Sequence, residues 1–235
     1  MPNANASAPQ EVAALLVISD KILSGRTKDK NIGYIAEYLS TLGIDLREVR
    51  VIGNEEGAIV DAVNVLRHRY AYVFTTGGIG PTHDDITSDC VAKAFGVPID
   101  VDPRALAIPK GTDLVLNEVS GAPGFWIGNV IVMAGVPSIM QAMLDEVAPK
   151  LKTGIRMLSE TVRANVRESD IGTQLDEIAK ANPGVVIGSH PFFDPQNGPS
   201  TTVVLRATDT QRLQRAKRAV EDMMERVQGA QSGNA

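Results

Sequence analysis

Three strand-like runs, each followed by a segment with helical spacing, fill the first hundred residues and restrict the fold more than any other feature. Residues 12–19 are almost continuously apolar, which is typical of a strand covered on both faces. The same reasoning predicts strands at 46–52 and 71–75 and helices at 32–42, 55–69 and 85–95. Parallel strands joined by helices require crossover connections, so the sequence predicts a three-layer α/β/α fold with a mostly parallel sheet.

The remainder of the chain predicts one more part of this sheet and then a second, smaller domain. After a Pro- and Gly-rich stretch at 98–124, a hairpin is expected around Gly128-Asn129, followed by a helix over 137–151. Beyond a boundary near 150–154, the pattern is β-α-β-β-α, with strands at 155–166, 185–189 and 201–207, helices at 170–181 and 213–227, and a loop at 191–200. The predicted division is a main domain at 12–152 and a small α+β domain at 153–228, with disordered tails at 1–11 and 229–235.

Composition restricts the compartment and the partners. The net charge is −5, so no overall basic field attracts nucleic acid, and no apolar run is long enough for a membrane span. The start of the chain lacks the basic and apolar regions of a signal peptide, and a lone Cys90 rules out an internal disulfide. A cytoplasmic protein without nucleic-acid or membrane partners is therefore expected.

The segment from Thr75 to Thr87 carries the clearest functional signal, and its sequence is TTGGIGPTHDDIT. It follows the third predicted strand, and ligands of open α/β sheets bind beyond the carboxyl ends of the strands. Gly77, Gly78 and Gly80 allow left-handed backbone and close approach of a ligand. Their amides, together with the N-terminus of the next helix, predict a phosphate-binding loop.

Two adjacent carboxylates, Asp84 and Asp85, stand beside this predicted anion site. They require a neutralising cation, a role as a base, or use as a helix cap, and the pattern alone leaves these alternatives open. A simple tight turn also remains open for the glycines, because the segment is not a Walker A motif. Three scattered histidines, of which His83 lies in the loop, and one cysteine give no zinc spacing.

The whole segment resembles the signature loop of the MoaB/Mog (molybdopterin-binding) domain family, and most closely its branch of competence/damage-inducible protein A (CinA) and stand-alone relatives. Residues 22–31, 121–125 and 135–138 resemble the other loops of that branch, and residues 168–171 and 187–193 resemble the second domain of the stand-alone relatives. The resemblance therefore covers nearly the whole chain. It implies a molybdopterin-binding-like α/β/α fold and assembly as a homo-oligomer.

The resemblance also implies roles for individual residues. Asp84 and Asp85 are the implied catalytic residues and the implied ligands of a divalent metal, Mg²⁺, Mn²⁺ or Co²⁺. The residues implied to bind a phosphorylated ligand are Thr76, Gly77, Gly78, Gly80, Pro81, Thr82, Thr87, Asp20, Asp29, Asn31, Gly135, Pro137 and Ser138.

Three functions are carried forward from the resemblance. The first is metal-dependent hydrolysis of an ADP-ribose-like diphosphate, the second is binding of molybdopterin or a nucleotide without turnover, and the third is adenylyl transfer to molybdopterin. The chain departs from the family pattern at Ser19, where glycine is expected, and at Lys21 and Ile139, where acids are expected. The stretch at 102–108 is also shorter than in relatives. Loss of these acids favours the second function over the first.

Overall fold

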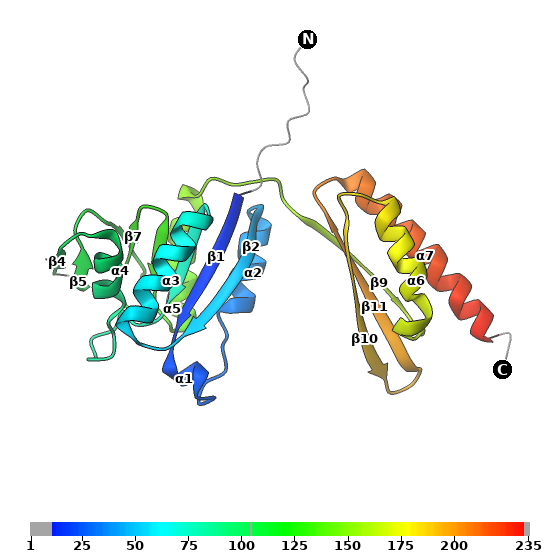
Figure 1. The fold of residues 1–235 in the computed structure, drawn as a ribbon, viewed down its shortest axis with the longest axis horizontal. Coiled ribbons are helices and arrows are strands. Elements are labelled where there is room, and N and C mark those ends of the chain that lie inside the picture. Colours follow the sequence, from blue (N-terminus) through cyan, green and yellow to red (C-terminus); the bar gives the residue numbers. More distant parts are fainter. Residues whose placement is uncertain (1–10, 104, 233–235) are drawn as a thin grey trace, which may run out of the picture. The chain divides into compact units, whose positions relative to one another are not determined.

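The computed structural model describes residues 11–103 and 105–232, and it divides the chain into two compact units, Met1–Ile155 and Arg156–Ala235 (Figure 1). Most of the predicted N-terminal tail lies outside the described residues, but Glu11 already belongs to the first strand. The predicted C-terminal tail is wrong at residues 229–232, which continue the last helix, and its remainder lies outside the described part. Among the described helices, none is long and apolar enough to cross a membrane.

The first unit contains a six-stranded sheet in the order β2-β1-β3-β8-β7-β6. Its parallel part is formed by β1 (Glu11–Ile18), β2 (Ile44–Ile52), β3 (Tyr72–Thr76) and β8 (Val130–Met133). The strands β7 (Gly124–Ile127) and β6 (Asp113–Val115) extend it antiparallel. The predicted hairpin at Gly128-Asn129 is confirmed as the β7–β8 turn.

Helices cover both faces of this sheet, because alternate side chains of its buried strands point to opposite sides. On one face, Leu15 and Phe74 pack with α2 (Ile32–Thr41) and α5 (Pro137–Val147). On the other face, Leu16 packs with α3 (Glu56–Arg69) and α4 (Thr87–Phe95). The predicted three-layer α/β/α fold with a mostly parallel sheet is confirmed.

Several local predictions in this unit are wrong. The stretch at 98–124 contains β4 (Ile99–Asp102) and β5 (Ala105–Pro109), paired in a separate small sheet, as well as the edge strand β6. A short helix, α1 (Asp20–Leu23), follows β1, and a 3-10 turn, η1 (Ala148–Lys150), follows α5. The helix predicted from residue 85 begins at Thr87, because the preceding residues form a turn.

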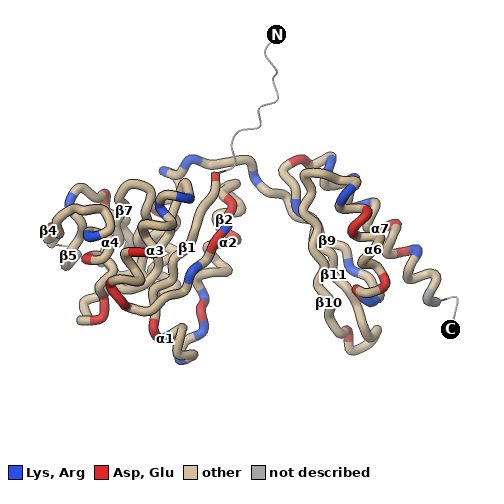
Figure 2. The backbone as a smooth tube through the Cα atoms, viewed as in Figure 1, with Lys and Arg blue, Asp and Glu red and all other residues tan. Residues whose placement is uncertain are grey.

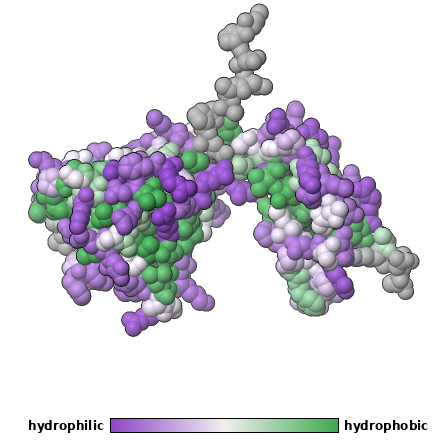
Figure 3. All heavy atoms as spheres, in the orientation of Figure 1, coloured by the Kyte–Doolittle hydropathy of each residue, from purple (hydrophilic) through white to green (hydrophobic). Residues whose placement is uncertain are grey.

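The second unit has the predicted β-α-β-β-α order. Its antiparallel sheet, ordered β10-β11-β9, is formed by β9 (Leu158–Ala164), β10 (Val186–Asp194) and β11 (Gly198–Ala207). Its helices α6 (Glu168–Ala181) and α7 (Thr210–Ser232) share a core with this sheet. The loop predicted at 191–200 is wrong, because the strands continue to a tight turn in which Asp194 accepts backbone amides of Gln196 and Asn197. Phe193, which is exposed, lies in β10 just before this turn, and Figure 3 shows apolar residues on the surface of this unit.

Candidate functional site

Three loops meet at the carboxyl ends of β1, β3 and β8, at the edge of the sheet where α1 lies (Figure 1). The amide of Gly77 donates to the carbonyl of Met133 at 3.1 Å. A Cβ on Gly77 would lie 2.3 Å from the carbonyl oxygen of Ile18, and one on Gly135 would lie 3.3 Å from the Gly77 Cα. Gly77 therefore has no room for a side chain. Its φ of +102° also disfavours any residue other than glycine.

Thr87 fixes the next part of the loop to the start of α4. Its hydroxyl donates to the carbonyl of Gly77 at 3.0 Å, and its amide donates to the carbonyl of Gly78 at 3.0 Å. Gly78 also has positive φ, and a Cβ there would meet the Thr87 hydroxyl at 2.2 Å. Thr87 is fully buried, so its role is to hold the loop in this conformation.

Thr82 connects the two carboxylates that follow. Asp85 accepts the Thr82 amide at 3.0 Å and the Thr82 hydroxyl at 2.6 Å, and Asp84 lies 2.5 Å from the same hydroxyl. One hydroxyl hydrogen can serve only one carboxylate at a time. Gly80 completes the turn, because a Cβ there would lie 2.6 Å from the Asp85 carboxylate.

These hydrogen bonds favour the ionised form of both acids. The bond from Thr82 is the main cause that lowers the pKa of Asp84. Partial burial raises the pKa of Asp85, but hydrogen bonds from the Thr82 hydroxyl and from the amides of Thr82 and Gly80 outweigh it, so the net pKa is lowered. Neither acid caps α4, whose N-cap residue Ile86 has no side-chain cap bond, and the capping alternative is therefore wrong.

The first loop reaches the same edge of the sheet. Asp29 accepts the amides of Asn31 at 3.1 Å and Ile32 at 2.8 Å and so caps α2. Asn31 is 5% exposed, and its side-chain amide donates to the carbonyl of Gly135 at 2.9 Å. Asp20, at the start of α1, accepts the amide of Asn54 at 3.3 Å. Within the described residues, no hydrogen bond links these groups to Asp84 or Asp85.

The remaining predicted residues lie around these contacts. Pro137 occupies the first turn of α5, and the neighbouring Ser138 is exposed at the N-terminus of that helix. Pro81 is exposed at the outer side of the Gly-rich loop, whereas Thr76 is 1% exposed at the end of β3. The exposed N-terminus of α5 adds a second positive helix end to the site.

Buried oxygens without hydrogen-bond partners concentrate at this edge. In the described part of the chain there are six such side-chain atoms, on Asp29, Asn31, Asn54, Thr75, Thr76 and Thr112. The first five belong to the ends of β2 and β3 or to the first loop. Each unsatisfied buried group costs about 1–3 kcal/mol, so the edge retains hydrogen-bonding capacity that the protein itself does not use.

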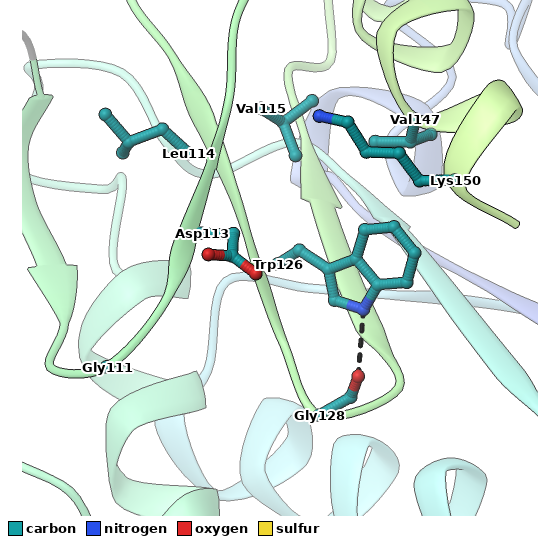
Figure 4. Close-up of a pocket in the computed structure, with 8 residues that line it drawn as sticks. All are labelled: Gly111, Asp113, Leu114, Val115, Trp126, Gly128, Val147 and Lys150. Atoms are coloured by element: carbon teal, nitrogen blue, oxygen red, sulfur yellow. Dashed lines mark hydrogen bonds between the residues drawn. The ribbon is translucent and has the colours of Figure 1, made fainter.

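A cavity of about 680 Å³ lies elsewhere, at the edge strand β6 and its neighbour β7 (Figure 4). Trp126 forms part of its wall and donates to the carbonyl of Gly128 at 2.8 Å, while Asp113 and Lys150 flank the indole. Gly128 precedes β8, so this cavity is at the opposite end of that strand from the Gly-rich loop. Its residues form no motif, and no pattern in the sequence groups them. The polar groups converge at the loop, which remains the candidate site.

The comparisons with known proteins divide the chain as the structure does. Residues 14–153 match the model of a probable molybdopterin binding domain, and residues 156–229 match that of the FAD synthase middle domain. The crystal structure of CinA, of unknown function, from Thermoplasma acidophilum is 28% identical with a TM-score of 0.56, covering 60% of this chain and 97% of that one.

Two groups of curated relatives are longer than this chain. A CinA-like protein from Gemmatimonas aurantiaca is 30% identical, covering 77% of this chain and 50% of the relative. A probable FAD synthase from Caenorhabditis briggsae is 28% identical, covering 77% of this chain and 44% of the relative. The chain thus spans about half of each of these proteins.

Proposed function

Because this chain belongs to the molybdopterin-binding MoaB/Mog domain family and has CinA-like relatives, we propose that it binds and hydrolyses an ADP-ribose-like diphosphate at the Gly-rich loop. The observation that carries the proposal is the pair of ionised acids, Asp84 and Asp85, held by Thr82 directly after Gly77 and Gly78. This places carboxylates beside a backbone suited to phosphate.

The loop would act first by binding. The backbone turns at Gly77 and Gly78, which both have positive φ, and the N-terminus of α5 adds a favourable end for an anion. Unpartnered oxygens on Asn31 and Thr76 provide acceptors for the hydroxyl and amino groups that a nucleotide carries on its ribose and base. A phosphorylated nucleoside therefore suits this edge better than a simple anion.

Hydrolysis would follow in one displacement. A water oxygen attacks one phosphorus atom of the diphosphate while the bond from that phosphorus to the bridging oxygen breaks. The attacking water loses its proton to a carboxylate, for which Asp85 is the proposed acceptor, and the products of ADP-ribose are AMP and ribose 5-phosphate. Asp85, whose pKa is lowered, is in the basic form at neutral pH.

A divalent metal fits the donor set of the loop. Within the described residues, no three His, Cys, Asp or Glu side chains come close enough to enclose an ion. Mg²⁺, however, usually keeps several waters and binds through one or two carboxylates and the substrate phosphates. Asp84 and Asp85 would hold it, and when bound it would supply charge neutralisation at the phosphates.

FAD is a second candidate substrate, favoured by the match of residues 156–229 to the FAD synthase middle domain. It carries the same adenylate-diphosphate group, so the same site chemistry applies. Binding without turnover is the alternative that Lys21 favours, because a cation stands where the family pattern places an acid.

The test is product release from ADP-ribose and FAD with Mg²⁺, Mn²⁺ or Co²⁺, together with direct binding measurements. Turnover that is lost in Asp85→Asn and Gly78→Ala but retained in Asp89→Asn, an exposed acid in the first turn of α4, would support the hydrolase. Binding of ADP-ribose without turnover under any metal would support the non-catalytic alternative. Absence of binding by the wild type would refute both.

A further inference from the structure

Residues 20–30, here named the cationic arm, connect β1 to α2 and carry an unusual local charge. The arm contains four exposed cations, Lys21, Arg26, Lys28 and Lys30, and only two acids, in a chain whose net charge is −5. Figure 2 shows these positive positions on α1 and on the segment that follows it. This concentration of positive charge opposes the overall charge of the protein.

The arm has a defined backbone conformation. The Ser19 hydroxyl accepts the Ile22 amide at 3.3 Å and so caps α1. The amide of Thr27 donates to the carbonyl of Lys21 at 3.0 Å, and Gly25, with a φ of +73°, closes the turn between them. The cations are therefore presented on a folded segment of chain, which lowers the entropy cost of using them together.

The acids of the arm do not neutralise its cations. Asp20 accepts the Asn54 amide, and Asp29 accepts the two amides at the start of α2. Across the described part of the chain, none of the four cations forms an ion pair or a side-chain hydrogen bond. Their charge is available to an anion from outside the protein.

Both ends of the arm belong to the candidate site. It begins after the carboxyl end of β1, and the residue that follows it, Asn31, donates to the Gly135 carbonyl. The charge of Lys21 is close enough to contribute to the lowered pKa of Asp84. In addition, Asn31 is 5% exposed and Thr76 is 1% exposed, and each has an oxygen without a partner at this edge. Unused buried acceptors at this edge, and unpaired cations on the arm that leads to it, indicate a ligand that carries both hydroxyl groups and negative charge.

We propose that the cationic arm binds the second phosphate of a nucleotide diphosphate whose first phosphate lies on the Gly-rich loop. The proposal rests on the proposed function and extends it to residues that lie outside the loop. Because Lys and Arg neutralise the phosphate directly, binding of a diphosphate does not require a divalent ion. The arm therefore selects a diphosphate over a monophosphate, and this selection weakens at high salt.

The experiment measures binding of ADP-ribose and of AMP by calorimetry, with EDTA present, at low and high salt. The test variant carries Lys21→Gln, Arg26→Gln, Lys28→Gln and Lys30→Gln, and Lys21→Gln alone is a milder second variant. The matched control carries Lys152→Gln, Arg156→Gln, Arg212→Gln and Arg218→Gln, which removes the same four charges at other exposed positions. Circular dichroism checks the fold of each.

The expected result is a loss of about tenfold or more in ADP-ribose affinity for the test variant, with AMP affinity changed less than about threefold and the control like the wild type. The Lys21→Gln variant should show part of the same loss. If a folded test variant keeps the wild-type affinities, the proposed role of the cationic arm is overturned and the proposed function still stands. Equal losses for both ligands would also overturn it. Failure of the wild type to bind either ligand would overturn the proposed function itself.

Discussion

At the scale of single residues, Thr82 has the most influence on the chemistry of the loop. Its amide and its hydroxyl both reach Asp85, and the hydroxyl also lies at hydrogen-bonding distance from Asp84. The pKa of both acids is therefore influenced by a neutral side chain. A change at this position alters the carboxylates without removing either of them.

We predict that Thr82→Val raises the pKa of both carboxyl groups. The hydroxyl bond stabilises the ionised form, so its loss moves the pKa up, toward the usual value. For any activity that needs the ionised acids, the fall in rate on the acidic side of the pH profile should then move to a higher pH. The rate at neutral pH should change less. Carbon-detected NMR titration of the aspartate carboxyls measures the shift directly. Thr82→Ser keeps the hydroxyl and is the control, and a shift of equal size in that variant would contradict the explanation.

Gly77 and Gly33 form a matched pair for the role of backbone geometry. Gly77→Ala places a methyl group against the Ile18 carbonyl at positive φ, and we expect a loss of roughly 1–3 kcal/mol in unfolding free energy. Gly33 lies in α2 with open space at its Cβ, so Gly33→Ala should stabilise by about 0.5–1 kcal/mol. Urea unfolding measures both, and effects of the same sign would show that loop geometry is not the cause.

At the scale of elements, α2 depends on a residue that precedes it. Asp29 accepts the amides of Asn31, the N-cap residue, and of Ile32, the first helical residue, while the Asn31 side chain makes no cap bond. We predict that Asp29→Ala destabilises the first unit by about 1 kcal/mol, with a smaller loss for Asp29→Asn, which keeps an acceptor. Thermal and urea unfolding test this. Equal stability of the alanine variant and the wild type would contradict the capping role.

The elements that sequence predicted best are those whose signal is local. The apolar run of β1 and the helical spacing of α2 reflect burial that periodicity detects directly. Strands β4, β5 and β6 were missed, because short strands among prolines and glycines are defined by their distant partners. In β10, Pro191 indicated a loop, yet an edge strand tolerates proline.

The same distinction holds at the candidate site. The positive φ of Gly77 and Gly78 agrees with the expectation from three clustered glycines. The arrangement of Asp84 and Asp85 could not be read from spacing, because an acid before a helix suggests a cap as readily as a turn. The contact of Asn31 with Gly135 joins residues 104 positions apart, and only the resemblance to a known family had grouped them.

At the scale of the whole molecule, the chain consists of two units with separate cores. Leu15, Leu16 and Phe74 belong to the two apolar clusters of the first unit, and Val203 and Leu205 belong to the cluster of the second. No cluster contains buried residues from both units in the described part of the chain. All of the candidate site residues lie in the first unit, as does the cationic arm.

We therefore predict that two fragments, residues 1–155 and 156–235, fold separately. The first fragment should bind ADP-ribose within about twofold of the full chain, because binding depends on contacts that lie within it. The second should fold with lower stability, since a small domain buries a smaller fraction of its surface, and should not bind. Circular dichroism with urea and calorimetry measure both properties. If the first fragment folds but its affinity falls tenfold, the second unit contributes to the ligand site, and its role would then extend beyond its own fold.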